Sequence, residues 1–98
     1  MALKKEITLD NGIIVNYHRI VSLNKITNQK NIIEVASYTS EEKREEEKAY
    51  YEDESNDKKM NVFINTIYQN KEYSEDETIK EAYEYLKTTE MFQGAEDV

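Results

Sequence analysis

The chain lacks several residue types on which common active sites depend. None of its 98 residues is cysteine, which excludes disulfide scaffolds, thiolate zinc sites and cysteine nucleophiles. Only two glycines occur, so the sequence contains no glycine-rich phosphate loop and no nucleophile elbow. The single histidine, His18, has no second histidine or cysteine with which to complete a transition-metal site. These absences predict a protein that is not an enzyme and holds no cofactor or metal.

Long apolar runs are also missing. No stretch approaches the roughly 18 apolar residues that a membrane-spanning helix needs, and residues 1–5 lack the apolar segment of a signal peptide. Small secreted domains often rely on disulfides, so the lack of cysteine favours an intracellular origin. We therefore expect one soluble domain over residues 1–98, cytoplasmic at synthesis and without a membrane partner.

Negative charge is concentrated in the second half of the chain. The net charge is −8, of which residues 1–40 contribute +2, residues 41–59 contribute −4 and residues 60–98 contribute −6. Such a surface repels phosphate backbones, which argues against direct nucleic-acid binding but not against a basic protein. The carboxylates alternate with lysines, a pattern typical of a solvated face rather than of paired catalytic carboxylates. Nothing in the sequence indicates a small-molecule substrate.

Residues 3–38 read as three β-strands. Asp10, Asn11 and Gly12 signal a hairpin, and a three-residue loop with Gly12 in the left-handed conformation would set Ile7 opposite Val15. Residues 21–26 continue the second strand, residues 27–31 form a turn, and residues 32–38 form the third strand. Odd-numbered apolar residues predict one buried sheet face, made of Ile7, Leu9, Ile13, Val15, Tyr17, Val21 and Leu23.

A highly charged segment, residues 41–59, separates these strands from the rest. Ser40 is a candidate N-cap and good helix formers follow it, but the segment offers almost no apolar residue, so helix and loop both stay open. Residues 53–57 read as a loop, and Asp53, Ser55 and Asp57 only begin a calcium-binding pattern that then fails.

The last third of the chain predicts a strand and a helix. Residues 60–68 form a fourth strand with apolar residues on both faces, as in a strand that is covered on both sides. Ser74 and Glu77 make a capping box, and the helix buries Ile79, Ala82, Tyr83 and Leu86 and stops near Gly94. The predicted fold class is therefore α+β: an antiparallel sheet of about four strands, a C-terminal helix packed on it, and a charged excursion between strands three and four.

Tyrosine gives the best indication of an interaction surface. Of the 8 tyrosines, Tyr17, Tyr38, Tyr68 and Tyr83 fit core or core-edge positions. Tyr50 and Tyr51 flank the charge run and Tyr73 lies off the predicted faces, so these three are candidate partner-binding residues, with core-edge packing as the alternative. His18 is interpreted as a strand residue on the polar face.

Four stretches together carry a resemblance: residues 8–20, 33–38, 82–88 and 94–98. The sequence of these stretches resembles that of small proteins encoded by phages and prophages of Gram-positive bacteria, among their tail and baseplate genes. The resemblance covers nearly the whole chain and transfers no catalytic residue. It implies a structural or assembly role in which the protein binds other virion proteins or itself, with localisation in the host cytoplasm at synthesis and possible association with the virion.

Two functions from different classes follow. The first is a phage structural or assembly module that acts through protein–protein contacts. The alternative is an acidic inhibitor that mimics nucleic-acid charge and binds a basic host protein, an idea weakened by the lysines that interrupt the acidic run. In either case we expect residues 41–57 to be the least stable part of the fold and to face the partner.

Overall fold

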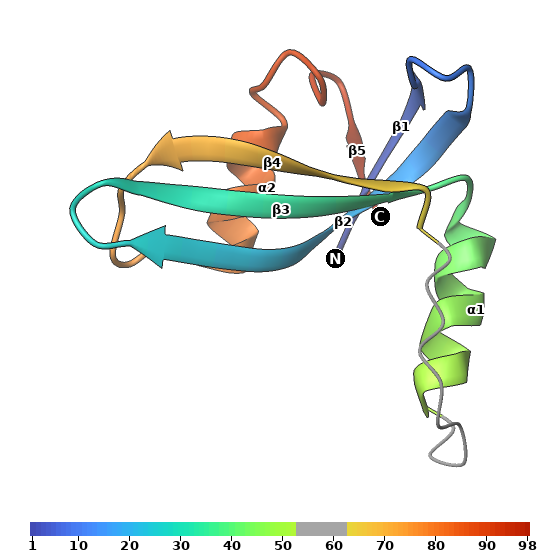
Figure 1. Cartoon of the computed structure of the whole chain (residues 1–98), viewed down its shortest axis with the longest axis horizontal. Coiled ribbons are helices and arrows are strands. Elements are labelled where there is room, and N and C mark those ends of the chain that lie inside the picture. Colours follow the sequence, from blue (N-terminus) through green and yellow to red (C-terminus); the bar gives the residue numbers. More distant parts are fainter. Residues whose placement is uncertain (53–62) are drawn as a thin grey trace.

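An antiparallel sheet organises the chain, as predicted. A computed structural model describes residues 1–52 and 63–98 (Figure 1). Along the chain the elements are β1 (Leu3–Thr8), β2 (Ile14–Ile26), β3 (Lys30–Tyr38), α1 (Glu41–Glu52), β4 (Asn65–Glu72), α2 (Ile79–Leu86) and β5 (Glu96–Asp97). The strand order is β4-β3-β2-β1-β5. The α+β fold class and the C-terminal helix are confirmed, and the short β5 is a strand that the sequence did not predict.

The β1–β2 hairpin has the predicted three-residue loop. The amide of Leu9 donates to the carbonyl of Ile13 at 2.8 Å, and Ile7 pairs with Val15. Gly12 has a φ of +86°, the left-handed conformation that glycine adopts without a steric penalty. The turn residues therefore set the register, because this loop places apolar side chains opposite one another.

The predicted single buried face of β2 is wrong. The buried residues of this strand are Val15, His18 and Ile20, whereas Ile13 and Val21 are exposed. A bulge between Ile20 and Ser22 changes which side chains face the core, and β1 has a second irregularity between Lys4 and Ile7. The interpretation of His18 as a polar-face residue is also wrong, since its side chain is 0% exposed.

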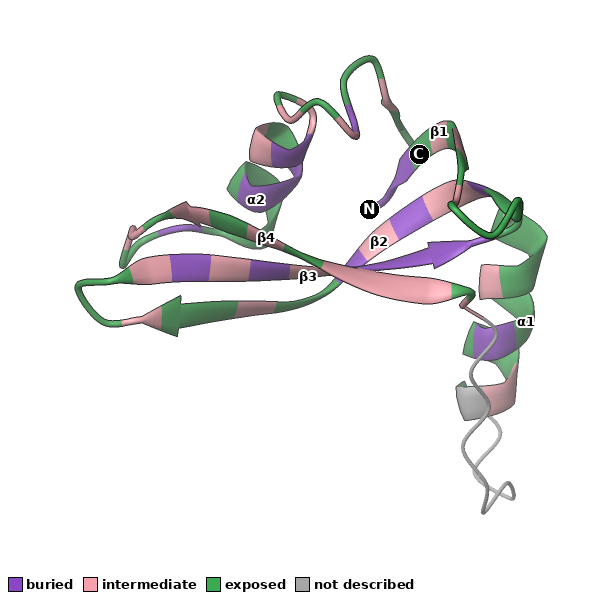
Figure 2. Cartoon of the chain, turned by 45° about the horizontal axis from the view of Figure 1, so that its top comes forward, coloured by how far each residue is buried: buried purple, intermediate pink, exposed green. Residues whose placement is uncertain are grey.

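The core lies between one face of the sheet and α2. Figure 1 shows α2 behind β3 and β4, and Figure 2 shows buried and half-buried residues alternating along the first part of β3, up to Val35. Side chains from the strands and from the C-terminal third meet there: Leu3, Ile20, Ile33, Val35, Ala82, Tyr83, Leu86 and Phe92. Each large apolar side chain that is fully buried stabilises the fold by about 1.5–3 kcal/mol.

The N-cap of α2 lies four residues later than predicted. Thr78 is the N-cap and its hydroxyl accepts from the amide of Glu81, while the Glu81 carboxylate accepts from that hydroxyl. The predicted box residue Glu77 is instead buried, and Ile79 is exposed rather than in the core. The helix ends at Leu86, so the predicted stop at Gly94 is wrong.

Strand β4 is an edge strand, shifted along the chain relative to the prediction of residues 60–68. It pairs only with β3 in the described part of the sheet, and Tyr68 is 65% exposed. The expected cover on both faces and the core-edge position of Tyr68 are therefore wrong. Residues 60–62, the loop at 53–57 and its calcium-like pattern lie outside the described residues. Within the ranges 1–52 and 63–98, neither helix has the length and apolar character needed to cross a membrane.

Candidate protein-binding groove

Residues 41–52 of the charged segment form a regular helix, α1. Ser40 caps it as predicted, since its hydroxyl accepts from the amide of Lys43 at 3.3 Å. Glu41 and Glu42 occupy the first turn, where negative charge interacts favourably with the positive end of the helix dipole. The question whether this part is helix or loop is thereby answered for residues 41–52.

A buried carboxylate joins α1 to the sheet. Glu47 is 2% exposed, and its Oε1 accepts hydrogen bonds from the Tyr38 hydroxyl at 2.8 Å and from Arg44 at 2.9 Å. Arg19 approaches the same oxygen at 3.6 Å and donates from Nε to the Tyr38 hydroxyl. The interpretation of the carboxylates as a solvated face is therefore wrong for Glu47, which supplies a polar anchor in place of the apolar one that the sequence lacks.

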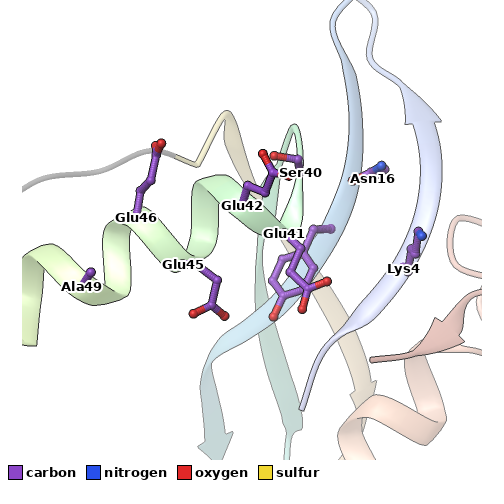
Figure 3. A pocket seen from close by; sticks show the side chains of 9 residues that line it. Lys4, Asn16, Ser40, Glu41, Glu42, Glu45, Glu46 and Ala49 are labelled. Atoms are coloured by element: carbon purple, nitrogen blue, oxygen red, sulfur yellow. The ribbon is translucent and has the colours of Figure 1, made fainter.

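A groove lies between α1 and the β1–β2 hairpin, with a cavity volume of about 630 Å³. Figure 3 shows the helix along one side and the strands that carry Lys4 and Asn16 along the other. The residues that line it are Lys4, Asn16, Tyr17, Ser40, Glu41, Glu42, Glu45, Glu46 and Ala49. Most of the lining surface is apolar, although four of the nine lining residues are glutamates.

The groove is negatively charged. Its helix side carries four glutamates, whereas Lys4 is the one cation among the lining residues. Of these glutamates only Glu46 has an ion pair with a described residue, Lys43 at 3.2 Å. The pKa of Tyr17 is raised, mainly by burial, and the negative charges of Glu41 and Glu45 add to this increase. The positive charges of Arg44 and Arg19 lower the pKa of Tyr17, but both guanidinium groups form ion pairs with Glu47.

The carboxylates of the groove do not converge on a point. In the part of the chain that the structure describes, no three acidic or histidine side chains are placed to hold a metal ion. The four glutamates are instead distributed along about one and a half turns of α1. The arrangement is therefore suited to positive charges that are themselves spread along a ligand.

The structure does not bring the predicted tyrosines together. Tyr50 is half-buried in α1, Tyr51 also belongs to α1 but its side chain lies outside the described residues, and Tyr73 follows β4. The β3–β4 register puts Tyr73 near Lys30 at the start of β3, whereas α1 follows the other end of that strand. Because eight residue steps of about 3.3 Å separate the two ends, Tyr50 and Tyr73 cannot form one contact site.

Sequence reasoning missed Tyr17 as a groove residue and His18 as a buried one. A signal was present for the groove, since Glu41, Glu42, Glu45 and Glu46 have the spacing of neighbours on one side of a helix. For Tyr17, its strand position alone did not reveal that a helix would lie beside it.

Comparison of the chain with protein-family models, with curated proteins and with solved structures found no match.

Proposed function

We propose that this protein is a non-catalytic structural or assembly module of a phage or prophage, associated with the tail or baseplate, that acts through contacts with other virion proteins or with itself. The phage origin is supported by the resemblance of four stretches to phage proteins, residues 8–20, 33–38, 82–88 and 94–98. Action through protein–protein contacts is supported by the partial exposure of the sheet.

The face of the sheet opposite α2 is covered near Tyr38, which bonds to Glu47 of α1, but is exposed near Tyr68, and this observation carries the proposal. Ile33 and Val35 of β3 face the α2 side, so Glu34 between them faces the opposite side. There its carboxylate accepts from Ser22 at 3.0 Å and from the exposed Tyr68 hydroxyl at 3.2 Å. An exposed tyrosine of this kind favours a protein–protein contact, since tyrosine is enriched at such interfaces.

The outer edge of β4 adds a second route to association. Its backbone groups on that side pair with no strand in the described ranges. Unpaired strand edges accept a strand from another chain unless the protein blocks them. A module of this kind can therefore extend its sheet by contact with a partner.

The buried polar side chains fit a structural role. His18 lies between Ser37 Oγ and the Lys5 carbonyl, each at 2.8 Å from a ring nitrogen. Glu47 anchors α1, and Glu77 forms an ion pair with Lys71 at 2.6 Å that ties the segment before α2 to β4. Each of these groups holds two elements together, which supports a module without a catalytic role.

Sedimentation of the pure protein and affinity capture from a phage lysate test this function. We expect either self-association or the enrichment of an identified tail or baseplate protein. The double variant Tyr50→Ser, Tyr51→Ser should weaken either contact if these residues anchor the partner. A strict monomer that enriches no virion protein contradicts the proposal, while an unaffected double variant would remove only the two tyrosines from the contact.

The sorting of charge on α1 also favours the alternative, an acidic inhibitor of a basic host protein. Although Lys43 interrupts the acidic run in the sequence, it is absent from the groove lining, so the glutamates face one side without it. Capture of a host nuclease or another nucleic-acid-binding protein, lost at high salt, would favour this function over the first.

A further inference from the structure

The groove between α1 and the β1–β2 hairpin combines three features that together specify a ligand. It has an apolar floor, an aromatic ring that is half-buried, and glutamates along one wall. Glu41, Glu42 and Glu45 have no ion pair within residues 1–52 and 63–98, so their charges are open to a cation from outside. The negative wall makes a basic occupant electrostatically complementary.

We propose that this groove binds a short, extended, basic segment of a partner protein, with one lysine or arginine side chain held between the Tyr17 ring and the carboxylates of Glu41 and Glu45. The inference rests on the proposed function in one respect, namely that the protein acts by contacting other proteins. It adds which surface is used and what chemistry the partner presents.

The spacing of the glutamates favours an extended segment. Residues four apart on a helix are about 5–6 Å from one another, which applies to Glu41 and Glu45 and again to Glu42 and Glu46. Side chains on one side of an extended chain repeat every two residues, or about 6.6 Å. Basic residues at alternate positions of the partner therefore match the two successive carboxylates, whereas adjacent basic residues point to opposite sides of the segment.

The Tyr17 ring is held in place before any ligand binds. It packs edge-on against Tyr38, with ring centroids 5.9 Å apart and planes at 71°. Tyr38 in turn donates to Glu47, so the contact that anchors α1 also positions the floor of the groove. A cation near the face of a tyrosine ring is attracted by its quadrupole, and a preformed site loses less entropy on binding.

The test uses the full chain and labelled peptides of about eight residues. One peptide carries two lysines at alternate positions, an isomer carries them side by side, and a third has glutamates in their place. Fluorescence anisotropy measures affinity, and NMR chemical shifts locate the contact. We expect the alternating peptide to bind most tightly, to lose affinity as salt rises, and to shift the signals of Tyr17, Glu41 and Glu45.

The decisive variants have equal charge. The double variant Glu41→Gln, Glu45→Gln should lower the affinity for the alternating peptide about three- to tenfold, the loss expected when two solvent-exposed ion pairs are removed. Glu75→Gln with Glu90→Gln removes the same charge from exposed positions that do not line the groove and should change the affinity little. Equal weakening by the two double variants, or shifts confined to other elements, would overturn the groove and leave only general attraction to an acidic protein.

Two further outcomes separate this inference from the proposed function. If the wild-type chain captures an identified virion protein and Glu41→Gln with Glu45→Gln captures it equally well, the groove assignment fails while the proposed function stands. If the wild type dimerises and that variant is monomeric, the occupant is a second copy, which overturns the assignment to a different partner. If the wild type is monomeric and captures no virion protein, the proposed function fails, and the peptide measurements still decide the groove.

Discussion

Replacing Tyr83 by phenylalanine should destabilise the fold through a single oxygen atom. Tyr83 lies on α2, is 3% exposed, and its hydroxyl accepts from the amide of Ile20 at 2.8 Å while donating to the carbonyl of Met1 at 2.9 Å. Phenylalanine keeps the ring and creates no large cavity, but leaves the buried Ile20 amide without its acceptor. A buried donor that loses its partner costs about 1–3 kcal/mol, which is the expected decrease in the free energy of unfolding.

Tyr85 on the same helix provides the matched control. Its hydroxyl donates to the Asn70 carbonyl at 3.1 Å in an exposed position where water can replace it, so Tyr85→Phe should change stability by no more than about 0.5 kcal/mol. Denaturant unfolding followed by circular dichroism gives both values, and each kcal/mol corresponds to about 4–8 °C in Tm for a domain of this size. Equal stability of Tyr83→Phe and Tyr85→Phe would refute the claim that the Tyr83 hydroxyl of α2 is needed as the acceptor for the Ile20 amide of β2.

Three other perturbations address the core, the buried histidine and the anchor of α1. Leu86→Ala should lower the free energy of unfolding by about 2–5 kcal/mol because this side chain is fully buried, whereas Ile79→Ala, at an exposed position, should change it little. An unchanged melting temperature for Leu86→Ala would show that α2 is not part of the core. Burial lowers the pKa of His18 from 6.5. The neutral imidazole therefore contributes stability that is fully present above about pH 6.5 and is lost as the pH falls through the lowered pKa. Urea titrations at several pH values should show this loss of stability, and the variant His18→Gln should no longer show it. Glu47→Gln should lower the free energy of unfolding by about 1.5–3 kcal/mol and release α1 from the sheet, whereas Glu46→Gln should lower it by at most about 0.5 kcal/mol. If hydrogen exchange shows residues 42–48 equally protected in both variants, Glu47 does not anchor α1.

Local signals in the sequence predicted much of the sheet. The turn at Gly12 determined the hairpin register because a left-handed residue was required there, and the apolar run over residues 32–38 indicated the third strand, whose register stayed open. Short-range patterns succeed in these places because the residues that decide the structure are close together in the chain.

Long-range contacts were beyond those patterns. The bulge after Ile20 cannot be read from alternation, which assumes that none is present. The choice of Thr78 over Ser74 as N-cap depends on Glu77, which is withdrawn from the first turn by Lys71 on β4 and by the Asn31 amide. Both features are consequences of packing between segments that are distant in the sequence.

The groove illustrates the same limit. The spacing of the glutamates could have indicated an acidic helix face, but only the buried pairing of Glu47 with Arg19 and Tyr38 decides where α1 lies.

The expectation that residues 41–57 are the least stable part of the fold stays a prediction for residues 41–52, and residues 53–57 lie outside the described part of the chain. Amide hydrogen exchange over α1 and α2 tests it, with faster exchange expected in α1 because its anchor is a single polar cluster.

The central claim is that this chain works by contacting other proteins through the face of the sheet opposite α2 and through the α1 groove. Cross-linking of the chain during affinity capture from a phage lysate, with the linked residues identified by mass spectrometry, tests it most directly. We expect an identified tail or baseplate protein, or a second copy, linked to a lysine of this surface such as Lys4, which lines the groove. A monomer with no virion protein attached, or links confined to α2 and its Lys80, would contradict the claim.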